Sequence, residues 1–206
     1  MYTSQGPSID RSFDQGFKIA AERYGVVLLN FIILGIVILI SAVTVIGLIL
    51  WPAFIGGFYG SLVKIGRGDP AQIGDFFKIG FDKFGPLLGA MILYFLGIVV
   101  GLMFLLIPGI YLMVAWVFVP YLIVDKNLPV TEAFSESMNL IHKKVGWWKT
   151  FGLFCIMLLI SIGFEIIGFI PFIGIVISIL GTIFLAPFLY MVYAIYYIDS
   201  VDIDIS

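Results

Sequence analysis

Charge is scarce in this chain and missing from most of its length. Only 12% of the 206 residues are charged, whereas 62% are hydrophobic. Apart from Glu165, no charged side chain lies within residues 26–63, 86–124 or 150–198. A soluble domain carries about 25% charged residues, so these three apolar blocks are expected to face lipid. The composition therefore predicts a protein that crosses the membrane several times.

The residue types that usually carry chemistry are nearly absent as well. The chain has one cysteine, Cys155, and one histidine, His142. A single cysteine excludes an internal disulfide, and no phosphate-binding loop or zinc-protease motif occurs. We therefore expect no enzyme activity, no cofactor and no metal. The formal net charge of -2, with basic residues placed singly or in pairs beside acids, argues against nucleic acid as a partner.

Each apolar block is longer than the roughly 20 residues that cross a bilayer, so each predicts a hairpin of two helices. Prolines end one helix and favour the first turn of the next, which places the three breaks at Pro52, Pro108 and Pro171. The six predicted membrane helices cover residues 26–50, 52–66, 86–107, 109–125, 147–169 and 171–198. The second would reach only about 22 Å. Either its turn lies earlier, from Ser41 to Thr44, or this helix does not cross fully.

A short amphipathic segment precedes each hairpin and ends at a glycine, namely Gly25, Gly85 or Gly146. Its apolar residues recur at steps of three and four, which is typical of a helix with one apolar face. Such helices are expected to lie in the membrane interface with that face toward the acyl chains. The alternative is that the three faces pack on one another as a cytoplasmic cap. The predicted lipid-facing residues are Phe13, Phe17, Tyr24, Phe77, Phe81, Phe84, Phe134, Met138 and Ile141.

Amphipathic helix, glycine hinge and hairpin occur three times in the same orientation. We therefore predict an all-α, single-domain bundle of six transmembrane helices over residues 1–206. Its parallel repeats cover about 8–66, 70–125 and 129–198, and an acidic tail, 199–206, is expected to be disordered. All eleven Lys and Arg lie outside the three hairpin turns. Because loops that carry Lys and Arg are retained in the cytoplasm, both termini are expected on the cytoplasmic side of the cell membrane.

Glu165 is the one acid inside an apolar block, and Ser161 precedes it by one helical turn. An ionisable residue within a membrane helix is a functional candidate because its burial is costly. It lies six residues before Pro171, however, or about 9 Å in helical rise, and could simply reach the outer interface. A proton relay would need further acids or histidines at this depth, and the block contains none.

Four runs in the second half of the chain resemble a known family: residues 107–111, 116–125, 129–137 and 146–148. They are similar to prokaryotic six-helix membrane proteins that include the YciC-like proteins and the membrane domain attached to some glycerophosphodiester phosphodiesterases. The resemblance is clearest over residues 100–198. It implies a six-helix membrane fold and supplies no catalytic residues.

Two functions are compatible with these observations. The first is a non-enzymatic scaffold or accessory subunit that contacts membrane lipids and other membrane protein subunits through its interfacial helices. The second is a small-solute or ion channel or transporter with Glu165 lining its path. A continuous polar cavity that reaches Glu165 would favour the second function.

Overall fold

The computed structural model describes residues 8–42, 45–104, 106–168, 170 and 173–202, and the regular structure in these ranges is entirely helical. Five helical segments are long and apolar enough to cross a membrane, and the bent pair α1 and α2 would make a sixth. The predicted all-helical class is confirmed. The elements are α1 (Ile9–Glu22), α2 (Tyr24–Ala42), α3 (Val45–Arg67), α4 (Ile73–Asp82), α5 (Phe84–Phe104), α6 (Leu106–Ala115), α7 (Val119–Asp125), α8 (Val130–Asn139), the π-helix η1 (Leu140–Val145), α9 (Trp147–Gly168) and α10 (Ile173–Val201).

The three amphipathic segments form separate helices, as the periodicity predicts. α1 and α2 meet at an angle of 92°, at Arg23. Lys83 separates α4 from α5 in the same way, and Gly146 separates η1 from α9. Of the three predicted hinge glycines, only Gly146 requires glycine, because its φ is 96°. Gly25 and Gly85 lie inside the first turn of the following helix instead.

The predicted break at Pro52 is wrong. Pro52 lies inside α3, which begins at Val45 and contains 23 residues. The first turn therefore precedes Val45, which agrees with the earlier alternative position, although residues 43 and 44 are outside the described ranges. A helix of this length reaches about 34 Å and matches the hydrocarbon core, whereas the predicted 52–66 helix does not.

The second hairpin turns close to the predicted place, since Pro108 lies in the first turn of α6. The predicted helix 109–125, however, is split into α6 and α7. Pro120, near the start of α7, has no N–H to continue the helix. Ser137 of α8 provides hydrogen-bond partners for backbone groups at this break. Its hydroxyl donates to the Ala115 carbonyl at 2.8 Å and accepts from the Phe118 N–H at 3.3 Å. Pro171 lies outside the described residues, between α9 and α10.

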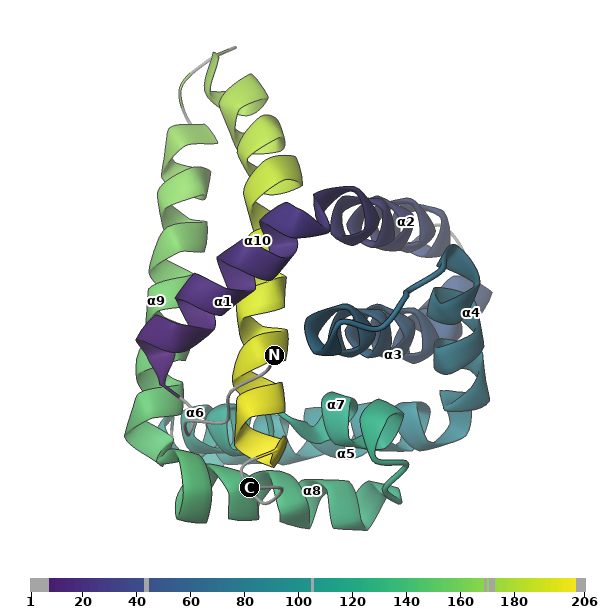
Figure 1. Cartoon of the computed structure of the whole chain (residues 1–206). Helices are drawn as coiled ribbons and strands as arrows, with labels where there is room; N and C mark the ends of the chain where they lie inside the picture. The colour runs from purple at the N-terminus through teal and green to yellow at the C-terminus, as the bar shows by residue number, and fades with distance from the viewer. Residues whose placement is uncertain (1–7, 43–44, 105, 169, 171–172, 203–206) are drawn as a thin grey trace.

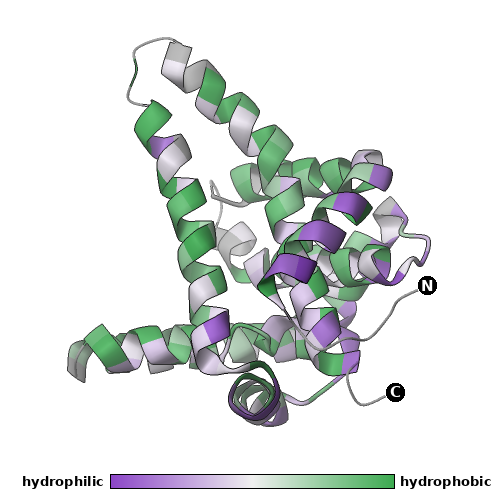
Figure 2. Cartoon of the chain, turned by 60° about the vertical axis from the view of Figure 1, so that its left-hand side comes forward, coloured by the Kyte–Doolittle hydropathy of each residue, from purple (hydrophilic) through white to green (hydrophobic). Residues whose placement is uncertain are grey.

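α3 is the central helix and α9 and α5 are peripheral. In the candidate spans, 67% of α3 is buried, compared with 17% of α5 and 12% of α9. α9 and α10 run side by side, and α1 lies across α10 (Figure 1). The hydrophilic residues gather mainly on one side of the molecule, while the α9–α10 hairpin extends away as a largely apolar arm (Figure 2). We call the hydrophilic side the charged face.

Small residues, not the aromatic residues, form the closest helix crossings. A Cβ atom added at Gly57 of α3 would lie 2.0 Å from the Phe76 carbonyl oxygen of α4. One added at Gly80 of α4 would lie 2.0 Å from the Ala53 carbonyl oxygen. Such residues let two helix backbones approach closely. α4 is therefore held directly against α3, and the larger side chains of α4 flank this crossing.

Candidate functional site

The predicted lipid-facing residues of α4 lie at the molecular surface. Phe77 is 39% and Phe81 45% exposed, whereas Phe76, one position earlier, is fully buried. Phe84, at the start of α5, is half-buried. Because Phe76 and Gly80 take the inner side of the crossing, Phe77 and Phe81 remain exposed on the outer side.

The corresponding residues of the first segment pack partly on α10. The Phe17 ring stacks on Phe188 with a centroid distance of 5.1 Å, and Tyr24 stacks on the same ring at 5.4 Å. Phe13 is half-buried and stacks on Phe17. The inner line of α1 is formed by its buried residues, Ser12, Gly16 and Ala20. This aromatic group therefore forms a rim beside the α1–α10 contact.

In the third segment the prediction for Ile141 is wrong, because this side chain is completely buried. Leu140 and Val145 are buried with it in η1. A π-helix shifts the side-chain direction relative to an α-helix, and here it turns these residues inward. Met138 is half-buried, and the Phe134 ring packs edge-on against Trp116 at 4.8 Å. Protein contacts thus account for most of this apolar face.

The C-terminal ends of α3, α7 and α10 converge on the charged face. Arg67 makes a two-pronged contact with Asp125, in which one N–H donates to Oδ2 at 2.9 Å. The Tyr197 hydroxyl donates to the same carboxylate at 2.9 Å. Asp202 lies 3.5 Å from Arg67 and 4.0 Å from Lys126. We call these five residues the Arg67–Asp125 cluster.

The same three helices are also joined by stacked tyrosine rings next to the Arg67–Asp125 cluster. The Tyr59 ring of α3 stacks on Tyr121 of α7 at 4.5 Å, and Tyr121 stacks on Tyr197 of α10 at 4.9 Å. One tyrosine from each of the three helices therefore belongs to a single stack.

Residues 199–201, which the sequence assigns to the tail, continue α10. Asp199 is 3% exposed and lies 3.7 Å from the Arg11 guanidinium of α1. The expectation of a disordered tail is therefore wrong for residues 199–201, and Asp199 and Asp202 contact Arg11, Arg67 and Lys126. Asp204 is outside the described ranges.

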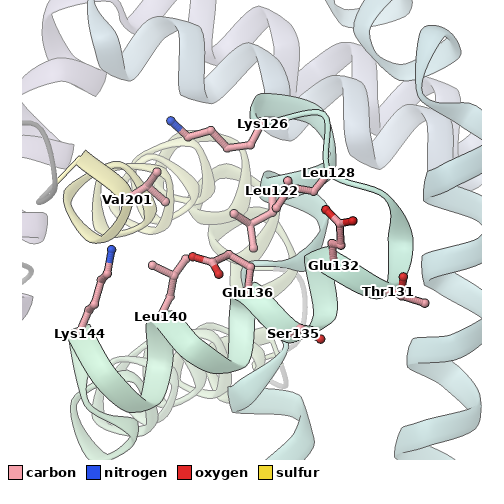
Figure 3. Close-up of a pocket in the computed structure, with 10 residues that line it drawn as sticks. All are labelled: Leu122, Lys126, Leu128, Thr131, Glu132, Ser135, Glu136, Leu140, Lys144 and Val201. Atoms are coloured by element: carbon pink, nitrogen blue, oxygen red, sulfur yellow. The ribbon is translucent and has the colours of Figure 1, made fainter.

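A groove of about 550 Å³ opens beside this cluster, between α8, α7 and the end of α10. Glu132 and Glu136 rise from α8 on one side, while Lys126 and Lys144 flank Val201 on the other (Figure 3). Its floor is apolar. We call it the α8 groove; its remaining lining residues are Leu122, Leu128, Thr131, Ser135 and Leu140. Both signs of charge around an apolar floor suit a protein segment more than a simple ion.

Glu165 and Ser161 line a second cavity, of about 340 Å³, between α9, α10 and Phe31 of α2. We call it the Glu165 cavity. Ser161 donates its hydroxyl hydrogen to the Met157 carbonyl at 3.0 Å. Thr182 adds a further polar side chain, and Tyr190 and Tyr193 line the part nearer the charged face. The structure brings the two predicted polar residues together in one cavity, but in the described ranges no cation accompanies them.

The Arg67–Asp125 cluster was not identified from the sequence. A weak signal for it exists, because Arg67 and Asp125 are the last residues of apolar helices and Asp202 directly follows one. Position alone does not show that these ends meet, since Arg67 and Asp125 are 58 residues apart.

Comparisons with protein families, with curated proteins and with solved structures give no match for this chain. The resemblance to the YciC-like membrane proteins therefore stays a prediction.

Proposed function

We propose that this chain is a non-enzymatic integral membrane protein that acts as a scaffold or accessory subunit. One observation carries the proposal. The charged face is joined by ion pairs among α1, α3, α7 and α10, while the peripheral helices α5 and α9 expose apolar side chains over most of their length. A rigid polar face above lipid-exposed hairpins suits a protein that presents a surface to partners.

The orientation follows from the distribution of cations. All eleven Lys and Arg lie in the described ranges, from Arg11 to Lys149, and none lies between residues 150 and 206 or near the hairpin turns. Because basic loops stay in the cytoplasm, the charged face is cytoplasmic in this proposal. The three hairpins then cross the membrane, and the turn around Ile170 faces outward.

The convergence of α3, α7 and α10 supports three parallel repeats. α3 and α10 correspond to the second helix of the first and third predicted repeats, and α7 is the C-terminal part of the second helix of the second repeat. Their ends meet in the Arg67–Asp125 cluster and in the tyrosine stack. An axis along the membrane normal relates parallel repeats. In this proposal the axis passes close to these contacts.

Two surfaces are suited to the proposed contacts. Exposed Phe77 and Phe81 of α4 lie beside Lys78 and Lys83, an arrangement suited to the headgroup region of a bilayer. The α8 groove lies on the charged face and is suited to a segment of a partner membrane protein. Lipid and protein contacts are thereby assigned to separate elements.

The channel alternative is less well supported, because the Glu165 cavity does not join the charged face. Its lining residues come from positions 157–165 of α9, 181–193 of α10 and Phe31, and Glu165 is the only charged one among them. A conducting path would need polar groups that continue toward the Arg67–Asp125 cluster.

Orientation is tested with single cysteines in a Cys155→Ser background. Gly74 of α4 is exposed with open space around it, and Ile170 is 52% exposed. In intact cells an impermeant thiol reagent should label Ile170→Cys and leave Gly74→Cys unlabelled. Labelling of Gly74→Cys from outside would reverse the orientation.

Partner contact is tested by photo-crosslinking in cells. Benzoylphenylalanine at Ser135, in the α8 groove, should give discrete crosslinks to protein, whereas the same residue at Leu39, which is 72% exposed on α2, should give lipid adducts. Identical products at the two positions would contradict the proposal that the α8 groove contacts a partner protein.

The transporter alternative is tested by measuring cation or proton flux through reconstituted vesicles. Flux that Glu165→Gln abolishes would show that the protein is a transporter and not a scaffold.

A further inference from the structure

The Glu165 cavity has a polar end and an apolar end. Ser161, Glu165 and Thr182 lie toward the turn between α9 and α10, three to nine residues from the helix ends at Gly168 and Ile173. Met157, Leu189 and Tyr193 line the other end. The positions of Glu165 and Met157 on α9 differ by about 12 Å in helical rise. The cavity is therefore elongated along the hairpin.

In the part of the chain that the structure describes, Glu165 has no cationic partner. Every Lys and Arg belongs to the described part of the protein, and the ion pairs there involve Arg11, Lys64, Arg67 and Lys126, with acids other than Glu165. Ser161 donates to a backbone carbonyl and so uses its only hydrogen elsewhere. The Glu165 side chain is exposed, so its carboxylate is accessible to a ligand that enters this mostly apolar cavity. A positive group is the natural partner for such a carboxylate.

The walls of the cavity restrict what can bring that charge. A calcium ion takes about six to eight oxygen ligands, more than one carboxylate and two hydroxyl side chains supply. A magnesium ion would keep most of its water and leave the apolar end of the cavity unoccupied. A neutral acyl chain would fill the apolar end but leave the carboxylate uncompensated. A ligand that satisfies both ends carries a cationic head and a hydrocarbon body.

We infer that the Glu165 cavity binds a cationic amphiphile, with an amine or quaternary ammonium head against the Glu165 carboxylate. Its hydrocarbon chain runs along Leu185 and Ala186 toward Tyr190 and Tyr193. The head group lies near the outer end of the hairpin, where it remains partly hydrated. This binding goes beyond the scaffold role and involves no transport.

The test is native mass spectrometry of the purified protein released from micelles of a neutral detergent. The probe is decyltrimethylammonium, with decyl glucoside as a neutral probe of equal chain length. We expect a one-to-one adduct with the cationic probe and about tenfold less with the neutral one, which corresponds to about 1.4 kcal/mol. Equal binding of the two probes would overturn the inference.

Variants separate the charge from the shape of the cavity. Glu165→Gln should lower the cationic adduct about tenfold, and Glu165→Asp, which keeps a carboxylate, should retain most of it. Ala186→Phe fills the apolar end and should weaken binding while Glu165 is intact. Glu22→Gln, an exposed position on α1, is the matched control and should bind as the unmodified protein does. Unchanged binding by Glu165→Gln contradicts the inference.

A second arm identifies the source of the ligand. Adducts with phosphatidylcholine and phosphatidylethanolamine that depend on Glu165, without an adduct of phosphatidylglycerol, would support a lipid headgroup. Adducts of the single-chain probe alone would support a free amphiphile. Both outcomes retain the cationic head at Glu165. Failure of all these adducts would leave the cysteine-labelling and crosslinking results unaffected, so the two proposals are tested separately.

Discussion

Asp125 directly follows a long apolar stretch and Glu165 lies inside one, and the surroundings of the two acids are opposite. Asp125 receives hydrogen bonds from Arg67 and Tyr197 and lies near Lys126. Glu165 is exposed and lines a mostly apolar cavity without a cation. The first acid joins helix ends that are distant in sequence, so its role is structural. The second contributes no such contact, which leaves its charge available for a ligand.

The same contrast applies to the two sides of the molecule. On the charged face, helices are held by ion pairs, hydrogen bonds and close backbone crossings. Toward the far ends of the hairpins, contacts are largely apolar and many side chains are exposed, such as Leu39 and Ile107 at 72% and 75%. Substitutions on the charged face should therefore cost more stability than substitutions near Glu165.

The largest effect is expected from Gly80→Leu in α4. The new side chain would begin 2.0 Å from the Ala53 carbonyl oxygen, so the α3 and α4 backbones would have to separate. We expect a loss of about 3 kcal/mol or more, observed as a lower thermal midpoint by circular dichroism. Gly74→Leu in the same helix meets open space and is the control. Equal midpoints for the two variants would show that the α3–α4 crossing is not tight.

Asp125→Asn should have the next largest effect. Arg67 would lose its strongest acceptor in a cluster where the Asp125 side chain is 9% exposed. Because the Arg67 side chain is 28% exposed, solvent reduces the cost to about 2 kcal/mol. Replacing both residues by Arg67→Met with Asp125→Leu should recover part of the loss, measured by thermal unfolding. A double variant that is less stable than Asp125→Asn would contradict this account.

A smaller effect, dependent on pH, is expected from Asp75 at the start of α4. The Gln72 N–H donates to its carboxylate at 2.8 Å, and Lys64 lies at 2.8 Å. These contacts lower the pKa of Asp75 from its ordinary value of 3.8. Since Asp75 has the lower pKa in the folded state, its charge contributes to the free energy of unfolding above a pH of 3.8. This contribution is lost as the pH falls through the lowered pKa.

Asp75→Asn should therefore cost up to about 1 kcal/mol at neutral pH, because Asn can still accept from the Gln72 N–H and only the charge near Lys64 and the helix N-terminus is lost. Its difference from the unmodified protein should shrink as the solution is acidified below about pH 4. Asp82→Asn, at an exposed position of the same helix, is the control. A difference that persists unchanged at low pH would show that the charge of Asp75 is unimportant.

The smallest effect is expected from Glu165→Gln in the absence of a ligand. With no ion pair to break, the thermal midpoint should stay within the range of an ordinary surface substitution, about 0.5 kcal/mol. A loss as large as that of Asp125→Asn would show that Glu165 has a structural partner, and the contrast between the two acids would fail.

Several features were predictable from local sequence. Residues 9–22, 73–82 and 130–145 are helical with one apolar face, because the spacing of their apolar side chains is a local property. The Glu165–Ser161 pair was also predictable, since residues four apart share a helix face. For the first turn the sequence allows two positions, Pro52 and Ser41 to Thr44, because a proline can also lie inside a helix, as Pro52 does in α3.

By itself, the sequence determined the segregation of charge, the helical class and the three pairs of apolar helices, since hydrophobic pattern and length act within each segment. Only the tertiary structure decided that Asp125 meets Arg67 and Tyr197, which lie 58 and 72 residues away. It also decided that Phe76 and Ile141 turn inward while Phe77 stays exposed. Phe76 turns inward where Gly57 and Gly80 allow the α3 and α4 backbones to touch, and Ile141 turns inward in the π-helix η1. Such contacts depend on the partner helix as much as on the segment itself.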